Sequence, residues 1–141
     1  MARTVLLDSG FLIALVNAND PDHSRCGDVW ASLRGNVLTV EGVLVEAAHL
    51  LRRVPGGPDA AIGIVVTAGV ESVPCDAPRL GRAAALMRRY HDVPMDLVDA
   101  LLLAVAETSG INEILTLDLR GFLTYRLGRR GAFRVLPAPC S

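Results

Sequence analysis

This chain of 141 residues contains no lysine, and all 14 of its basic residues are arginine. Phosphate-handling sites that depend on a lysine side chain are therefore excluded. Aromatic residues make up 4% of the chain and do not alternate with basic residues, so a stacking platform for single-stranded RNA is not expected. The formal net charge of −1 also lacks the positive excess that is typical of many nucleic-acid binders.

Cysteine is scarce as well, with Cys26, Cys75 and Cys140 forming an odd set without a closely spaced pair. This spacing predicts no metal-binding cysteine pair and is typical of a reducing, cytoplasmic compartment. We expect no membrane segment, because the charge-free run 60–70 is shorter than the roughly 20 apolar residues that a spanning helix needs. Asp8 interrupts the first apolar run, which argues against a signal peptide.

Short apolar runs alternate with longer segments of helical character along the whole chain. We expect strands at residues 4–7, 37–40, 70–74, 113–117 and 133–136. We expect helices at residues 11–16, 20–33, 42–53, 59–68, 77–90, 96–108 and 121–127. This alternation predicts an α/β protein, a single domain over residues 1–141, with a mostly parallel central sheet covered by helices on both faces.

Two of the expected helices have informative apolar patterns. In the helix at 77–90, the spacing of Leu80, Ala84 and Met87 predicts the face that packs inward. The helix at 96–108 is apolar almost all round, which predicts a central, buried position.

Four carboxylates lie inside or at the edge of apolar runs, namely Asp8, Glu46, Asp99 and Asp118. A buried carboxylate without a partner has a large desolvation cost, so each needs a cation, several N–H donors or a metal ion. Asp8 and Asp118 close expected strands, and the carboxyl ends of parallel strands meet at one edge of a sheet. Glu46 and Asp99 fall near helix starts and can join that edge. If the four acids share one site at this edge of the sheet, the expected ligand is Mg²⁺ or Mn²⁺, because hard cations bind several oxygen atoms.

Two hydroxyl groups accompany these acids. Thr116 lies two residues before Asp118, hence on the same strand face, and Ser9 follows Asp8 directly. Both are candidate accessory groups that ligate an ion or orient a carboxylate. One or two ions held by the acids would activate water and neutralise charge in the transition state of phosphodiester hydrolysis. The sequence therefore favours a metal-dependent hydrolase.

Each acid also has a purely structural interpretation. Asp96 and Asp99 fit a variant of the capping box at the start of a helix. Asp8 and Asp118 each fit a turn in which the carboxylate accepts a backbone N–H. Glu46 has few local partners of this kind, and its structural interpretation is a position on the surface of its helix. A metal site explains the four acids together, whereas the structural interpretations explain them one at a time.

Two other functions are weighed against this one. An aspartyl-phosphate-type phosphatase would use Asp8 as a nucleophile. Such sites usually have a second aspartate two residues later, where this chain has Gly10, and a lysine that binds phosphate. A non-catalytic module would use the acids only to bind an arginine-rich partner.

The segments around the acids resemble the PIN-domain ribonucleases, and specifically the small VapC-type toxins of bacterial toxin–antitoxin systems. The matching segments are LLDSGFLIAL around Asp8, VLVEAAHLL around Glu46, MDLVDALLLAVAE around Asp99 and LTLDLRGF around Asp118. They follow the order of the family and span nearly the whole chain. One departure is Gly121, where many relatives have an acidic or polar residue.

This resemblance implies a three-layer α/β/α sandwich and Mg²⁺- or Mn²⁺-dependent cleavage of an RNA, whether tRNA, rRNA or mRNA. It implies that Asp8, Glu46, Asp99 and Asp118 are the metal-binding and catalytic acids, with Asp96 as an accessory acid. It also implies a homodimer and a cognate antitoxin that blocks the site.

Arginines crowd the C-terminal stretch that begins beside the last of these acids. They are Arg120, Arg126, Arg129, Arg130 and Arg134. We interpret the cluster as a candidate RNA-contacting rim, since arginine is suited to bidentate contact with phosphate. The alternative interpretation is an ordinary solvated basic face.

Overall fold

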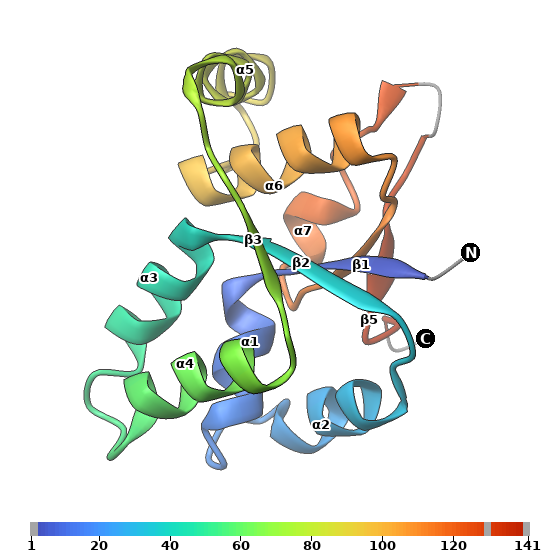
Figure 1. Ribbon diagram of the computed structural model, residues 1–141. Coiled ribbons are helices and arrows are strands. Elements are labelled where there is room, and N and C mark those ends of the chain that lie inside the picture. Colours follow the sequence, from blue (N-terminus) through green and yellow to red (C-terminus); the bar gives the residue numbers. More distant parts are fainter. Residues whose placement is uncertain (1–2, 129–130, 140–141) are drawn as a thin grey trace.

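A five-stranded parallel sheet forms the middle layer of the molecule (Figure 1). The computed structural model describes residues 3–128 and 131–139. The strands are β1 (Thr4–Leu7), β2 (Asn36–Val40), β3 (Glu71–Val73), β4 (Glu113–Leu115) and β5 (Arg134–Leu136). They lie in the order β3-β2-β1-β4-β5, and every pairing is parallel. The predicted parallel sheet is confirmed, with β1 at its centre.

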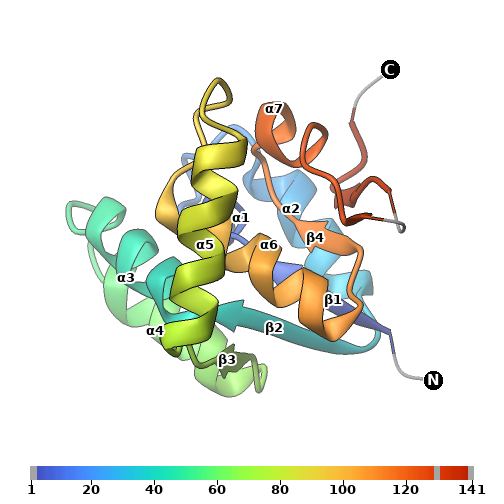
Figure 2. The same cartoon turned by 90° about the horizontal axis from the view of Figure 1, so that it is seen from above.

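Helices cover both faces of this sheet. They are α1 (Ser9–Val16), α2 (His23–Ser32), α3 (Glu41–Leu50), α4 (Gly57–Thr67), α5 (Ala77–Arg89), α6 (Leu97–Ser109) and α7 (Leu119–Phe122). Figure 1 shows α5 and α6 on one side and α1, α2 and α4 on the other. Figure 2 looks down on the layer of α5 and α6. Each predicted strand and helix has a counterpart, and the predicted α/β/α sandwich is confirmed.

Side chains of the central strand pack alternately into two separate cores. Leu6 belongs to the core beneath α5 and α6, whereas Val5 and Leu7 belong to the core beneath α1, α2 and α4. This alternation follows from the two-residue period of a strand. Since both faces of β1 are buried, polar groups at its carboxyl end need partners within the fold.

The outer helix α5 buries a different face from the predicted one. Ala83 and Leu86 are fully buried, whereas Leu80 is 44% exposed, Ala84 is exposed and Met87 is only partly buried. The reason is that α5 packs mainly on α6, and the side it turns toward that helix carries Ala83 and Leu86 instead of the predicted set. The central helix α6 agrees with the prediction, because residues 99–106 are all buried.

The start of α2 also differs from the prediction. The pair Asp20-Pro21 predicts a helix start, but α2 begins at His23. The Asp20 carboxylate accepts the N–H of Asp22 at 2.9 Å, and the Asp20 carbonyl accepts the N–H of His23. These bonds form a turn before the helix, as aspartate side chains often do.

Within residues 3–128 and 131–139, none of the helices has the length and apolar content that crossing a membrane requires. The thiols of Cys26 and Cys75 are both free. Cys140 lies outside the described residues.

Candidate active site

Two of the predicted acids lie at the carboxyl edge of the sheet, where they cap helices. Asp8 follows β1, and its Oδ1 accepts the N–H of Ser9, the first residue of α1, at 2.8 Å. Asp118 lies beyond β4, and its Oδ1 accepts the N–H of Gly121 in α7 at 3.1 Å. β1 and β4 are neighbours in the sheet although most of the chain separates them. In open α/β sheets, ligands bind at such a topological switch point, where the order of the strands reverses.

Asp96 and Asp99 form a reciprocal capping box at the start of α6. The N–H of Asp99 donates to Asp96 Oδ1 at 2.8 Å, and the N–H of Asp96 donates to Asp99 Oδ2 at 3.2 Å. The structural interpretation of these residues therefore holds. Asp99 is nevertheless only 8% exposed, whereas Asp96 is exposed, so Asp99 carries the larger desolvation cost.

The two predicted hydroxyls connect the acids in a chain of hydrogen bonds. Thr116 is fully buried, donates to Asp8 Oδ2 at 2.7 Å and accepts the N–H of Asp118 at 3.0 Å. The Ser9 hydroxyl donates to Glu46 Oε1, which ties the middle of α3 to the start of α1. The resulting chain runs from Glu46 through Ser9, Asp8 and Thr116 to Asp118.

The acids share one electrostatic environment. Burial is the main cause that raises the pKa of Asp8 to about 6, and the charges of Asp118 and Glu46 raise it further. Burial likewise raises the pKa of Asp99 to about 8, and the charges of three neighbouring aspartates add to this effect. Carboxylates that raise one another's pKa in this way are sites that a cation would stabilise.

No arginine or histidine within residues 3–128 and 131–139 forms an ion pair with any of these acids. In the same part of the chain, no three carboxylate, imidazole or thiol groups are gathered closely enough to hold a metal ion as they stand. The donor set still fits a hard divalent ion, because it consists of oxygen atoms that repel one another and lack a counter-charge. Binding such an ion requires the carboxylates to turn toward one another.

The structure describes only some of the arginines that were predicted to contact RNA. Arg120 is exposed on α7, two residues after Asp118. Arg126 is exposed, but its Nη1 donates to three backbone carbonyls of the preceding turn, at 2.8 to 3.0 Å, so this group stabilises the turn. Arg129 and Arg130 lie outside the described residues.

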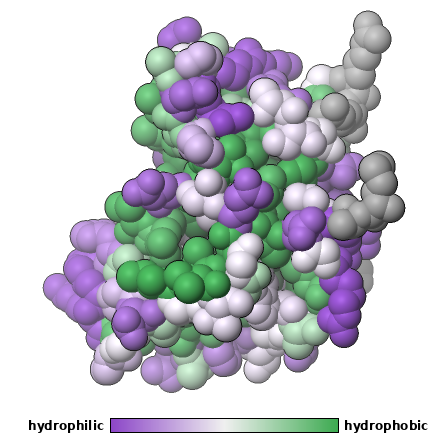
Figure 3. Space-filling view, in the orientation of Figure 1, coloured by the Kyte–Doolittle hydropathy of each residue, from purple (hydrophilic) through white to green (hydrophobic). Residues whose placement is uncertain are grey.

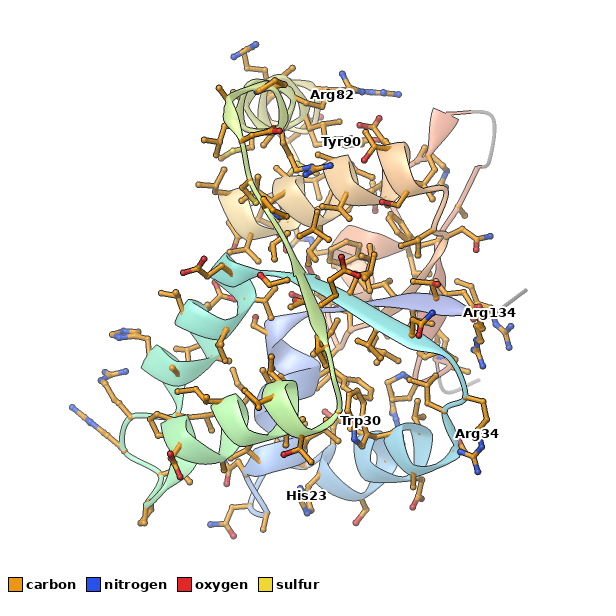
Figure 4. All side chains as sticks on the ribbon, viewed as in Figure 1. His23, Trp30, Arg34, Arg82, Tyr90 and Arg134 are labelled. Atoms are coloured by element: carbon orange, nitrogen blue, oxygen red, sulfur yellow. The ribbon has the colours of Figure 1, made fainter. Side chains whose placement is uncertain are left out.

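Arg134 lies at the opposite edge of the sheet and is not part of this rim. It begins β5, pairs in register with Glu113 at the start of β4 and contacts that carboxylate at 3.4 Å. Arg3 binds the same Glu113 carboxylate at 2.7 Å. Figure 4 labels Arg134 on the side of the molecule where β1 begins. Because β4 and β5 are parallel, the chain must return to the amino-terminal edge before β5 begins, which carries Arg134 away from Asp118.

Sequence reasoning missed one polar side chain beside the acids, Tyr125. Its ring is fully buried, and the nearby charges of Asp99 and Asp118 act on its hydroxyl. The sequence signal that could have identified Tyr125 is its i, i+4 spacing from Gly121. A glycine in a short helical turn leaves room for a large side chain one turn later.

The family model of the PIN domain matches residues 5–126, a range that contains every predicted acid. The chain belongs to the PIN-domain family. Ribonuclease VapC26 of Mycobacterium tuberculosis is 28% identical over 136 residues, which cover 94% of this chain and all of that protein. The 23S rRNA-specific endonuclease VapC20 of the same species is 31% identical over 118 residues, which cover 81% of this chain and 88% of that protein.

Solved structures give the same result. The crystal structure of M. tuberculosis VapC20, described as a sarcin–ricin loop cleaving toxin, matches with a TM-score of 0.72 and 30% identity. The match covers 78% of this PIN domain and 86% of that chain. A toxin–antitoxin complex from Klebsiella pneumoniae matches in fold, with a TM-score of 0.67 and 15% identity over 87% of this chain and 93% of that one. The predicted resemblance to VapC-type PIN domains is confirmed.

We expect Asp99→Asn to stabilise the metal-free protein, on the order of 1 kcal/mol in the free energy of unfolding at pH 7. Asparagine can still accept the N–H of Asp96 through its amide oxygen, and unlike Asp99 it neither takes up a proton nor buries a charge on folding. The raised pKa values of Asp8 and Asp99 mean that the folded state binds protons more tightly than the unfolded state. Stability of the metal-free protein should therefore fall as pH rises from about 4 to about 8, less steeply in the variant.

Thermal unfolding in the presence of a chelator, measured across this pH range, tests the expectation. Asp76→Asn is the matched control, because Asp76 is an exposed aspartate that caps α5 through the N–H of Arg79. It should leave the pH dependence unchanged. An equal pH dependence in the unchanged protein and in Asp99→Asn would contradict the role given to Asp99.

Proposed function

We propose that this PIN domain is an endoribonuclease that hydrolyses RNA phosphodiester bonds with a divalent metal ion, Mg²⁺ or Mn²⁺. The observation that carries the proposal is the set of mutually repelling carboxylates without a counter-charge among the described residues at the carboxyl edge of the sheet. The names of two relatives, a ribonuclease and a 23S rRNA-specific endonuclease, support RNA as the substrate class.

The site residues divide into two groups. The acids that would hold the ion are Asp8, Glu46, Asp96, Asp99 and Asp118. When bound, the ion supplies Lewis-acid chemistry at the scissile phosphate and neutralises charge among the acids. Thr116 and Ser9 orient two of these acids by donating hydrogen bonds to Asp8 and Glu46. Exposed Arg120, beside Asp118, would contact an RNA phosphate.

We also infer that the chain is the toxin of a toxin–antitoxin pair that acts in the cytoplasm. A relative described as a toxin and a fold neighbour solved in a toxin–antitoxin complex support this role. An arginine or lysine side chain of the antitoxin would supply the counter-charge that the acids lack, and would thereby block the site.

The two alternative functions have less support. A phosphatase site usually has a second aspartate where this chain has Gly10, and no lysine is available to bind the phosphate of its substrate. A non-catalytic acidic module would have no need for buried acids, because exposed carboxylates bind an arginine-rich partner with a smaller desolvation cost.

Exposed apolar side chains on α3 and α4 support a homodimer. Val45 and Leu50 of α3 are 63% and 56% exposed, and Ile62 and Val66 of α4 are 45% and 73% exposed. Figure 3 shows apolar residues gathered on this side of the molecule. A contiguous apolar surface of this kind is typical of an association face.

We expect Asp99→Asn to lower the rate of RNA cleavage by about 100-fold or more, because it removes a charge that binds the ion. Since the same change should stabilise the fold, loss of activity cannot come from unfolding. Cleavage of labelled RNA with Mg²⁺, with Mn²⁺ and with a chelator measures the effect. Asp76→Asn should cleave normally, and an aryl phosphate should not be hydrolysed. Full cleavage by Asp99→Asn, or cleavage that survives the chelator, would refute the proposal.

Val66→Arg should convert the homodimer into a monomer, because an arginine within the proposed association face would lose its hydration on dimerisation. Sedimentation equilibrium measures the change. Leu80→Arg is the control, since Leu80 is 44% exposed on α5, in the opposite layer. A dimer that persists in Val66→Arg would place the contact elsewhere, and a monomeric unchanged protein would refute the dimer itself.

A further inference from the structure

Tyr125 is a fully buried side chain that lies where the core beneath α6 meets the acidic edge of the sheet. Its ring packs edge-on against Phe122 and Tyr90, with ring centroids 5.1 Å apart in both pairs. Two aromatic contacts of this geometry fix the ring plane, and therefore also fix where the hydroxyl lies.

The hydroxyl of Tyr125 has no hydrogen-bond partner among residues 3–128 and 131–139. Buried polar groups in native proteins are almost always paired, so an unpaired hydroxyl next to a candidate site requires an explanation. Packing alone does not provide one. A phenylalanine would fill the same volume without burying an oxygen atom.

Gly121 shows which group the hydroxyl faces. A Cβ atom at position 121 would lie 2.6 Å from Asp118 Oδ2 and 2.8 Å from the Tyr125 hydroxyl oxygen, so both oxygens border the same small space. Asp118 Oδ1 accepts the N–H of Gly121, whereas Oδ2 accepts no hydrogen bond from the described residues. Among the described residues, the Tyr125 hydroxyl is a donor without an acceptor and Asp118 Oδ2 is an acceptor without a donor. The two therefore lie on either side of the space that Gly121 leaves open.

The chemistry of the pair fixes the direction of the bond. The Tyr125 phenol is protonated at neutral pH, because a tyrosine hydroxyl ordinarily ionises only at about pH 10. A protonated phenol next to a carboxylate donates, and Asp118 Oδ2 is the acceptor that borders the same space.

We infer that Tyr125 is a positioning residue whose hydroxyl donates to Asp118 Oδ2 and holds that carboxylate in the orientation that binds the divalent ion. The inference rests on the proposed function, because it takes Asp118 as a ligand. Groups that hydrogen-bond to metal-binding carboxylates fix their orientation, and removing such a group weakens metal binding.

Binding of Mn²⁺ to full-length Tyr125→Phe, measured by isothermal titration calorimetry, tests the inference. We expect roughly tenfold weaker binding than in the unchanged protein. The melting temperature of the metal-free variant should be equal or higher, because the change removes an unpaired buried hydroxyl. A purely structural role for the hydroxyl would not combine weaker metal binding with an undiminished melting temperature.

Tyr90→Phe is the matched control. The Tyr90 hydroxyl accepts the N–H of Arg126 at 3.0 Å, so its loss should lower the melting temperature and leave Mn²⁺ binding unchanged. Gly121→Ala is a second variant, because its methyl group would occupy the space between Asp118 Oδ2 and the Tyr125 hydroxyl. It should weaken Mn²⁺ binding as well.

The outcomes separate the inference from the proposed function. If the unchanged protein binds Mn²⁺ and Tyr125→Phe binds it equally well, the inference is overturned and the proposed metal site stands. If the unchanged protein binds no Mn²⁺, the proposed metal dependence is overturned, and the positioning role of Tyr125 falls with it.

Discussion

The desolvation of several carboxylates at one edge of a parallel sheet is the constraint on which the structure of this PIN domain depends. The chain meets it without a single arginine or histidine ion pair to these acids among the described residues. Backbone N–H groups at helix starts supply partners for Asp8, Asp99 and Asp118, and the hydroxyls of Ser9 and Thr116 supply the rest. The positive ends of the helix dipoles favour the same charges.

The capping interpretation and the metal-site interpretation therefore describe the same bonds. In a parallel sheet, helices begin where strands end, so a carboxylate that caps a helix also lies at the edge where ligands bind. Hydrogen bonds from N–H groups at helix starts offset only part of the cost of burying the Asp8 and Asp99 carboxylates, because the pKa values of both are still raised. The repulsion that remains among these carboxylates favours the binding of a cation at this edge of the sheet.

Local patterns were sufficient to predict the strands and α6, because buried parallel strands and a buried helix are apolar on all sides. The acids could be predicted because each interrupts such a run. Features that depend on tertiary contacts were not predictable in this way. The buried face of α5 follows from how that helix is turned against α6, and Arg134 lies far from Asp118 because β5 starts at the opposite edge. From the sequence alone, Tyr125 cannot be distinguished from an ordinary core aromatic residue. Only the tertiary structure places Gly121 and Asp118 beside its hydroxyl.

Gly121 occupies a position beside Asp118 at which the structure leaves no room for a side chain. A side chain at position 121 would collide with both Asp118 Oδ2 and the Tyr125 hydroxyl, so a glycine here and a tyrosine four residues later depend on each other. Here a phenol reaches the same space from the core. The Tyr125 hydroxyl thus adds a polar group beside Asp118 from a rigid aromatic cluster in the core.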